Sequence, residues 1–472
     1  MKQGEKMDID KVLRMNLEEV AKLIRNGTLS PVKLVTHIFE RINKLNSKLN
    51  AYITLNQEES LKEAKRLEKK LQRGKYIGPL HGIPIGLKDN IYTKNVKTTM
   101  GSKLYEHYLP SEEAVVVKKL KSSGAIVIGK HNLHQFAYGP TGDRSYYGAV
   151  ANPYDHEKMA GGSSSGSAAA VSAFLCYGAI GTDTSGSIRI PASFCGLVGM
   201  KPTYGRVSKR GVYPLSWVLD HVGPITRTIK ENALILNEIA GFDSEDESSI
   251  QRSNEDFMRL IGKDIDGSIL GILADYEEDT DEEIVECVED ALKIFEKLGA
   301  KIKRIILPNI EKYKEYQRTI IRCDAFAIHG NNLKKFPNDW DSEVKKRLFT
   351  GLEVKGYEYA RALQNRQLAK KEFNEVLNQV DIIITPTVTI LPPKINERYV
   401  SETNDDLGHI RWKILSMTAL TNYTGFPSLT IPCGFSSNGL PIGVQLIGKE
   451  FEEARLYQFG YALEQELDLK SI

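Results

Sequence analysis

The chain has 472 residues, of which 41% are hydrophobic and 26% are charged, close to ordinary globular usage. Its net charge of +2 is too small to indicate a nucleic-acid or membrane surface. The 5 cysteines are widely spaced and odd in number, as expected of reduced side chains. Residues 1–10 are polar and lack the apolar core of a secretory signal. We therefore expect a cytoplasmic globular protein that binds neither nucleic acid nor a membrane directly.

Helices are predicted for most of the first 75 residues. Asn16, Ser30 and Asn56 each precede apolar residues at helical spacing, and each can accept a hydrogen bond from a free backbone amide as an N-cap. The pattern then changes to short apolar runs broken by Gly and Pro, which predict strands at 83–87, at 125–128 and around Val198. The small-residue stretch 168–180 predicts a buried helix.

The second half of the chain alternates between strand and helix patterns. Strands are predicted at 269–273, 301–307, 380–385, 427–432 and 441–447. Helices are predicted at 282–298, 309–375 and 452–466. This order is typical of an α/β fold, and neither an internal repeat nor a long linker divides the chain. We therefore expect one domain over residues 1–472.

Two Gly- and Ser-rich segments lie close together, at 160–170 and 181–191. The first also has the composition of a flexible linker. It runs, however, into a stretch of high helix propensity, so its amides would lie at a helix N-terminus, where an anion or an oxyanion can be bound. Neither segment has the Gly-Lys-Ser/Thr ending of a phosphate-binding loop. We therefore expect both segments to line one pocket.

Lys88 follows directly after the apolar run 83–87. A lysine at the end of a strand is most often an exposed side chain. If it is buried instead, desolvation lowers its pKa, and the neutral amine can then act as a general base.

Three motifs together carry a specific resemblance. Lys88 in Lys-Asp-Asn, Ser163 in Gly-Gly-Ser-Ser and Ser187 in Gly-Ser-Ile-Arg resemble, in this order and spacing, the amidase signature family. The resemblance implies a single α/β/α domain around a large, mixed, twisted sheet with helices on both faces. It divides the chain into a helical segment, a signature core, a variable substrate-lining region and a C-terminal sheet and helix, at 1–75, 76–230, 231–375 and 376–472.

The resemblance also implies a mechanism. Ser187 would be the nucleophile that forms an acyl-enzyme, Ser163 would relay its proton from behind a cis peptide bond, and Lys88 would be the general base. To be neutral at pH 7, Lys88 needs a pKa lowered from about 10.4 toward 7. No cofactor and no metal are expected, because the relay and an oxyanion hole supply the chemistry. A catalytically inactive binding protein is disfavoured, since all three positions hold competent residues.

The loop around the nucleophile is expected to stabilise the charge that develops on the carbonyl oxygen. The amides of Thr184, Ser185 and Gly186 are predicted to form this oxyanion hole, and Asp183 and Arg189 to support the turn. Ser185 stands where the family usually has Gly, which leaves the geometry of the loop open.

Two functions fit the resemblance. One is a stand-alone amidase that converts a carboxamide to a carboxylate plus ammonia or an amine. The alternative is the glutaminase subunit of a glutamyl-tRNA(Gln)/aspartyl-tRNA(Asn) amidotransferase, which delivers ammonia to partner subunits. Arg366 matches the arginine that binds the carboxylate of glutamine in this glutaminase, but Ile414 and its neighbours stand where an acidic residue would bind the amino group. We therefore expect the stand-alone enzyme.

The expected substrate is a small-molecule amide. Tyr138 and Tyr213 are candidate walls of its pocket, together with Arg366 under the amidotransferase alternative. A homodimer is the expectation that follows from the family.

Overall fold

The computed structural model describes residues 9–253, 255–399 and 409–467. Residues 1–8, part of the N-terminal segment considered above, lie outside the described residues. Within the described ranges, no helix is long and apolar enough to cross a membrane.

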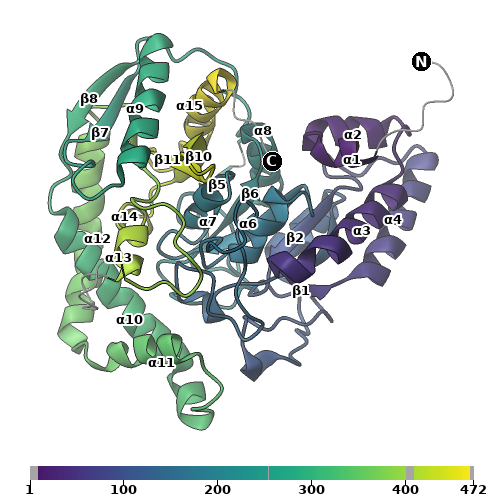
Figure 1. The fold of residues 1–472 in the computed structure, drawn as a ribbon, viewed down its shortest axis with the longest axis horizontal. Helices are drawn as coiled ribbons and strands as arrows, with labels where there is room; N and C mark the ends of the chain where they lie inside the picture. Colours follow the sequence, from purple (N-terminus) through teal and green to yellow (C-terminus); the bar gives the residue numbers. More distant parts are fainter. Residues whose placement is uncertain (1–8, 254, 400–408, 468–472) are drawn as a thin grey trace.

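One mixed sheet forms the centre of the described structure (Figure 1). Its strands are β1 (Tyr52–Leu55), β2 (Pro84–Lys88), β3 (Ile126–His131), β4 (Gly178–Asp183), β5 (Val198–Lys201), β6 (His221–Thr226), β7 (Ile269–Leu273), β8 (Lys301–Ile305), β9 (Ile382–Pro386), β10 (Ser428–Phe435) and β11 (Pro441–Ile447). Among the described residues, 11 strands pair in the order β1-β3-β2-β4-β6-β5-β10-β11-β9-β7-β8. The strands β3, β2 and β4 run parallel, as do β9, β7 and β8, and the other neighbours are antiparallel.

Helices surround this sheet (Figure 1). They are α1 (Ile9–Arg14), α2 (Leu17–Arg25), α3 (Pro31–Leu49), α4 (Gln57–Gln72), α5 (Val115–Ser122), α6 (Ser165–Ser172), α7 (Arg189–Phe194), α8 (Ile229–Ile239), α9 (Glu282–Lys297), α10 (Ile310–Lys335), α11 (Ser342–Phe349), α12 (Gly356–Leu377), α13 (Ile410–Leu415), α14 (Ala419–Thr424) and α15 (Glu453–Glu466). Short 3₁₀ helices are η1 (Lys103–Tyr105), η2 (Gln135–Ala137) and η3 (Thr350–Leu352).

The glycines of β4 show that helices lie on both faces of the sheet. A Cβ atom at Gly178 would meet Ile235 of α8, whereas one at Gly181 would meet Ser164, the residue before α6. Residues an odd number apart in a strand point to opposite faces, so α8 and the start of α6 lie on opposite sides of β4. The predicted fold class, a large mixed sheet between helices, is confirmed.

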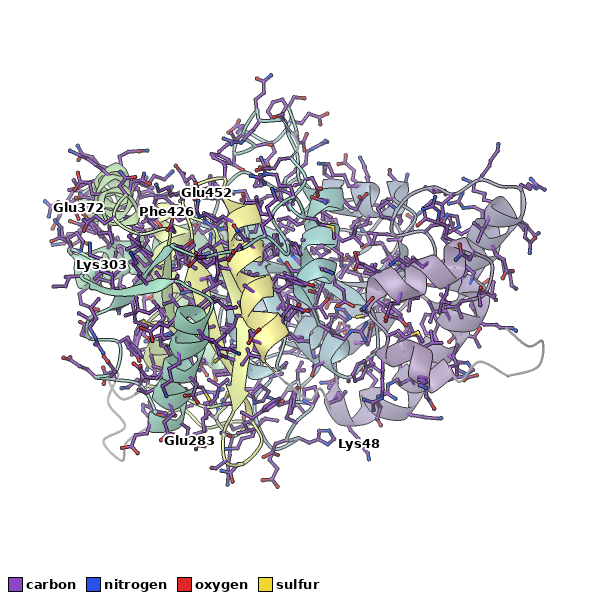
Figure 2. All side chains as sticks on the ribbon, turned by 90° about the horizontal axis from the view of Figure 1, so that it is seen from above. Lys48, Glu283, Lys303, Glu372, Phe426 and Glu452 are labelled. Carbon is purple, nitrogen blue, oxygen red and sulfur yellow. The ribbon has the colours of Figure 1, made fainter. Side chains whose placement is uncertain are left out.

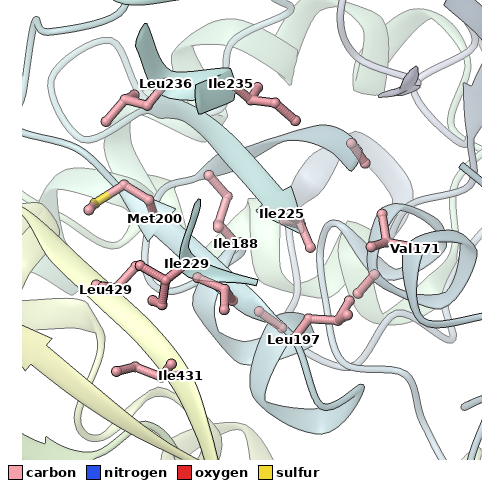
Figure 3. Close-up of a cluster of buried hydrophobic side chains, with 14 of the residues drawn as sticks. Val171, Ile188, Leu197, Met200, Ile225, Ile229, Ile235, Leu236, Leu429 and Ile431 are labelled. Atoms are coloured by element: carbon pink, nitrogen blue, oxygen red, sulfur yellow. The ribbon is translucent and has the colours of Figure 1, made fainter. Parts of the chain in front are cut away.

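An apolar cluster fixes the middle of the sheet. Figure 3 shows Met200 of β5, Ile225 of β6 and Leu429 of β10 together with Ile235 and Leu236 of α8, and all five side chains are fully buried. Burying one such side chain contributes about 1.5–3 kcal/mol. These side chains pack α8 against β5 and β6. By contrast, Figure 2 shows charged side chains on the outside of the molecule, such as the exposed Lys48 and Lys303.

Local sequence signals predicted some element ends and missed others, and the helix predicted over 309–375 is divided into α10, α11 and α12. Asn16 forms a capping box with Glu19, and Ser30 accepts a hydrogen bond from the amide of Lys33. Asn56 precedes α4, but its side chain caps no amide, so that prediction is wrong. The buried helix predicted over 168–180 ends at Ser172, because the residues from Gly178 onward pair with β2 and β6 as strand β4. Strand pairing here overrides helix propensity.

Candidate active site

Lys88 is the last residue of β2, which lies between β3 and β4 in the sheet, and its side chain is 0% exposed. Its Nζ lies 2.7 Å from Ser163 Oγ, 2.7 Å from Thr182 Oγ1 and 3.3 Å from the Thr182 carbonyl oxygen. Burial lowers the pKa of Lys88 to about 7, although the charges of Asp183 and Asp220 act to raise it. The alternative of an exposed surface lysine is therefore wrong. Thr182, which no sequence motif singled out, is its second side-chain partner.

Ser163 and Ser187 come from two loops that meet in the structure. The Gly162–Ser163 peptide bond is cis, and the amide of the next residue, Ser164, donates to the carbonyl of Ser187 at 3.2 Å. Ser163 is fully buried, while Ser187 is 7% exposed and lines a cavity. The hydroxyl of Ser187 has no hydrogen-bond partner among the described residues. The two Gly/Ser segments thus meet, although only the second contributes residues to the lining of the cavity, and the linker alternative is wrong because the first segment is buried.

The turn that precedes Ser187 is built around a buried ion pair. Asp183 Oδ1 and Arg189 Nη2 lie 2.9 Å apart, and both side chains are 0% exposed. The same carboxylate accepts hydrogen bonds from the amides of Gly186 and Ile188 at 2.7 and 3.0 Å. Burial acts to raise the pKa of Asp183, but Arg189 and these hydrogen bonds hold it well below its usual range. Arg189 also donates to Gln445 Oε1 of β11 at 2.5 Å, so the turn is anchored to the sheet.

The structure corrects the predicted oxyanion hole at one position. The amide of Gly186 is engaged by Asp183 at 2.7 Å and is therefore not free to bind a substrate oxygen. The amides of Thr184, Ser185 and Ser187 donate to no other described residue. Gly186 serves the turn in another way, because its φ of +128° and a Cβ that would lie 2.3 Å from Thr418 Oγ1 both require glycine.

Ser185, which stands in place of the usual glycine, is held by two side chains from distant helices. Its Oγ accepts a hydrogen bond from Gln317 Nε2 of α10 at 2.6 Å, and its carbonyl accepts one from Thr418 Oγ1 at 2.6 Å. The additional hydroxyl is thus bonded rather than left unpaired. Gln317 and Thr418 were missed by sequence reasoning, since neither lies in a motif.

A pocket of about 90 Å³ opens onto Ser187. It is lined by Ala137, Tyr138, Gly139, Pro140, Thr184, Ser185, Ser187, Leu215, Gln317, Arg318, Ile321, Arg322, Arg347, Thr350, Arg411, Trp412 and Leu415. Apolar and aromatic side chains and four arginines thus form the walls, and none of the described lining residues is Asp or Glu.

Of the three predicted substrate-binding residues, only Tyr138 reaches this pocket. The hydroxyl of Tyr213 lies 3.2 Å from that of Tyr105, and its ring stacks on another aromatic side chain. Arg366 donates to the carbonyl of Tyr423 at 2.9 Å and lies over the ring of Tyr204. The structure therefore does not bring Tyr213 or Arg366 into the pocket, because both are engaged by neighbours elsewhere.

The amino-acid sequence matches known proteins over almost its whole length. Residues 33–457 match the family model Amidase. A glutamyl-tRNA(Gln) amidotransferase subunit of Natranaerobius thermophilus is 37% identical over 97% of this chain and 97% of that protein. This relative supports the amidotransferase alternative better than the stand-alone enzyme.

Solved structures agree with the fold. A protein from a vestigial complex, related to the evolutionary origins of an s-triazine catabolic enzyme, matches with a TM-score of 0.92 at 28% identity over 97% of this chain and 100% of that chain. The crystal structure of an amidase matches with a TM-score of 0.86 at 32% identity over 96% of this chain and 100% of that chain. The chain therefore belongs to the amidase signature family of amide-hydrolysing enzymes.

Proposed function

We propose that the protein hydrolyses a carboxamide through an acyl-enzyme on Ser187, with Ser163 as proton relay and Lys88 as general base. The observation that carries the proposal is the fully buried Lys88, whose Nζ lies 2.7 Å from Ser163 Oγ. With a pKa of about 7, roughly half of this lysine is neutral at pH 7 and able to take a proton.

The proposed reaction has two stages, acylation of Ser187 and hydrolysis of the acyl-enzyme. Ser187 Oγ attacks the substrate carbonyl carbon and its proton passes to Ser163, whose own proton passes to Lys88 Nζ. The charge on the carbonyl oxygen is stabilised by unengaged amides of the Thr184 to Ser187 turn. The C–N bond then breaks as the proton returns through Ser163 to the leaving nitrogen. The amine or ammonia leaves at this step. Water then attacks the acyl ester by the same relay, and the carboxylate leaves from Ser187.

Two versions of this reaction differ in the substrate. The 37% identity to an amidotransferase subunit supports glutamine hydrolysis on behalf of partner subunits. The pocket supports a stand-alone amidase, because none of its described lining residues is an Asp or Glu that could bind the amino group of glutamine, and because Arg366 does not line it. On the pocket lining the stand-alone amidase is the first candidate, whereas the comparisons with known proteins favour the amidotransferase glutaminase, which is the second candidate.

The test is to incubate the purified chain alone with simple amides and with glutamine while released ammonia is measured. The stand-alone enzyme should release ammonia from simple amides, and Ser187→Ala and Lys88→Ala should each abolish this while their circular dichroism stays that of the wild type. Glutamine cleavage that appears only when amidotransferase partner subunits are added would establish the second candidate instead. Full activity in either variant would contradict the mechanism.

The homodimer stays a prediction that sedimentation of the purified chain tests.

A further inference from the structure

One cation in the pocket differs from its neighbours. The half-buried Arg322 of α10 lines the pocket, and its guanidinium makes no hydrogen bond and no ion pair with any described residue. Arg318 pairs with Glu315 at 3.1 Å, and Arg347 pairs with Glu343 at 2.6 Å. The charge of Arg322 is therefore not balanced by the protein around it.

The surroundings of Arg322 favour an anion. None of the described lining residues is acidic, and Ile321, Leu215 and Leu415 contribute apolar walls. A charge pair is stronger beside such walls than in bulk water, because the local dielectric response is weaker. A guanidinium also presents donors that match a carboxylate in a two-point contact.

The position of Arg322 relative to the nucleophile loop is set by one helix. Gln317, five residues earlier in α10, donates to Ser185 and lines the same pocket. Five residues correspond to about 7.5 Å along a helix axis. A carboxylate bound at Arg322 would thus be separated, along the substrate, by several covalent bonds from the amide carbon that Ser187 attacks.

We propose that the substrate is an amide that carries a carboxylate at its far end and no ammonium group beside it, such as the monoamide of a dicarboxylic acid, and that Arg322 binds this carboxylate. This inference rests on the proposed amide hydrolysis and deepens it by naming the substrate class. Glutamine is a poor match, since its ammonium group meets no carboxylate among the described lining residues.

Four amides of similar length test the inference: pentanamide, glutaramate, 5-aminopentanamide and glutamine. The wild type should hydrolyse glutaramate with a kcat/KM roughly ten to a hundred times that for pentanamide, as expected of a hydrogen bond between charged groups. Arg322→Gln should bring this ratio close to one, and Arg322→Glu should favour 5-aminopentanamide over glutaramate. Lys335→Gln, an equal charge change at an exposed residue of the same helix, should keep the wild-type ratio.

The outcomes separate the two proposals. Hydrolysis of pentanamide and glutaramate at equal rates by the wild type would overturn the inference and leave the proposed function standing. Release of ammonia from none of the four amides would contradict the proposed function. In that case the inference is decided by calorimetry of glutarate, which has a carboxylate at each end and no amide to hydrolyse. Wild-type binding that weakens at least roughly tenfold in Arg322→Gln supports it, and undetectable or equal binding overturns it.

Discussion

Replacing Lys88 by Met tests the physical basis of the mechanism, because it removes a titrating group from a fully buried position and keeps a side chain of similar length. In the folded protein the pKa of Lys88 is about 7, and in an unfolded chain a lysine has a pKa of about 10.4. Between these values the unfolded chain binds a proton that the folded chain does not. The contribution of Lys88 to the free energy of unfolding therefore rises with pH, and is lost as the pH falls toward 7.

The magnitude follows from the size of this shift. Each pKa unit corresponds to 1.36 kcal/mol, so the full difference between the two states is about 5 kcal/mol, reached above pH 10.4. Between pH 7 and pH 9 the free energy of unfolding of the wild type should rise by about 2 kcal/mol relative to Lys88→Met. Other buried lysines are present in both proteins, so their effects cancel in this comparison.

The assay is urea unfolding of both proteins at pH 7, 8 and 9, with Lys48→Met as a control for the loss of one positive charge at an exposed site. In parallel, kcat/KM of the wild type should rise with pH with a midpoint at about 7, and Lys88→Met should be inactive. A stability difference between wild type and Lys88→Met that stays constant with pH would show that Lys88 keeps its proton, which would refute its role as the base.

Three further substitutions probe the turn before the nucleophile. Gln317→Leu leaves the Ser185 hydroxyl without its 2.6 Å partner, so the free energy of unfolding should fall by about 1–3 kcal/mol, and Ser185→Gly in the same chain should restore it in a double-mutant cycle. Gly186→Ala places a Cβ atom 2.3 Å from a threonine hydroxyl and should lower kcat far more than it raises KM, whereas unchanged kcat would contradict a rigid turn. Asp183→Asn leaves the charge of the fully buried Arg189 uncompensated and should cost about 3–5 kcal/mol in urea unfolding.

Local sequence patterns predicted most of the described strands, but they missed β1 and β6 and placed β4 in a helix. The apolar run before Lys88 became β2, and residues 269–273 became β7. The resemblance to the amidase signature family marked Ser163 and Ser187, and the segments around them contain the glycines and small polar residues that tight turns need. Asp183 and Arg189 were predicted to support this turn, and the structure joins them in a buried ion pair.

The walls of the pocket were decided by tertiary structure alone. Gln317 lies 132 residues from Ser185 in the chain, on a charged helix without a motif, and Arg322 follows on the same helix. Nothing local distinguishes these residues from exposed ones, because their burial depends on how α10 packs against a distant loop. For the same reason a motif match placed Arg366 in the pocket, while packing gives it a backbone carbonyl as partner instead. Lys88, Ser163 and Ser187 each lie in a segment that a motif can identify, whereas many of the residues that line the pocket come from segments without a motif that meet only in the folded chain.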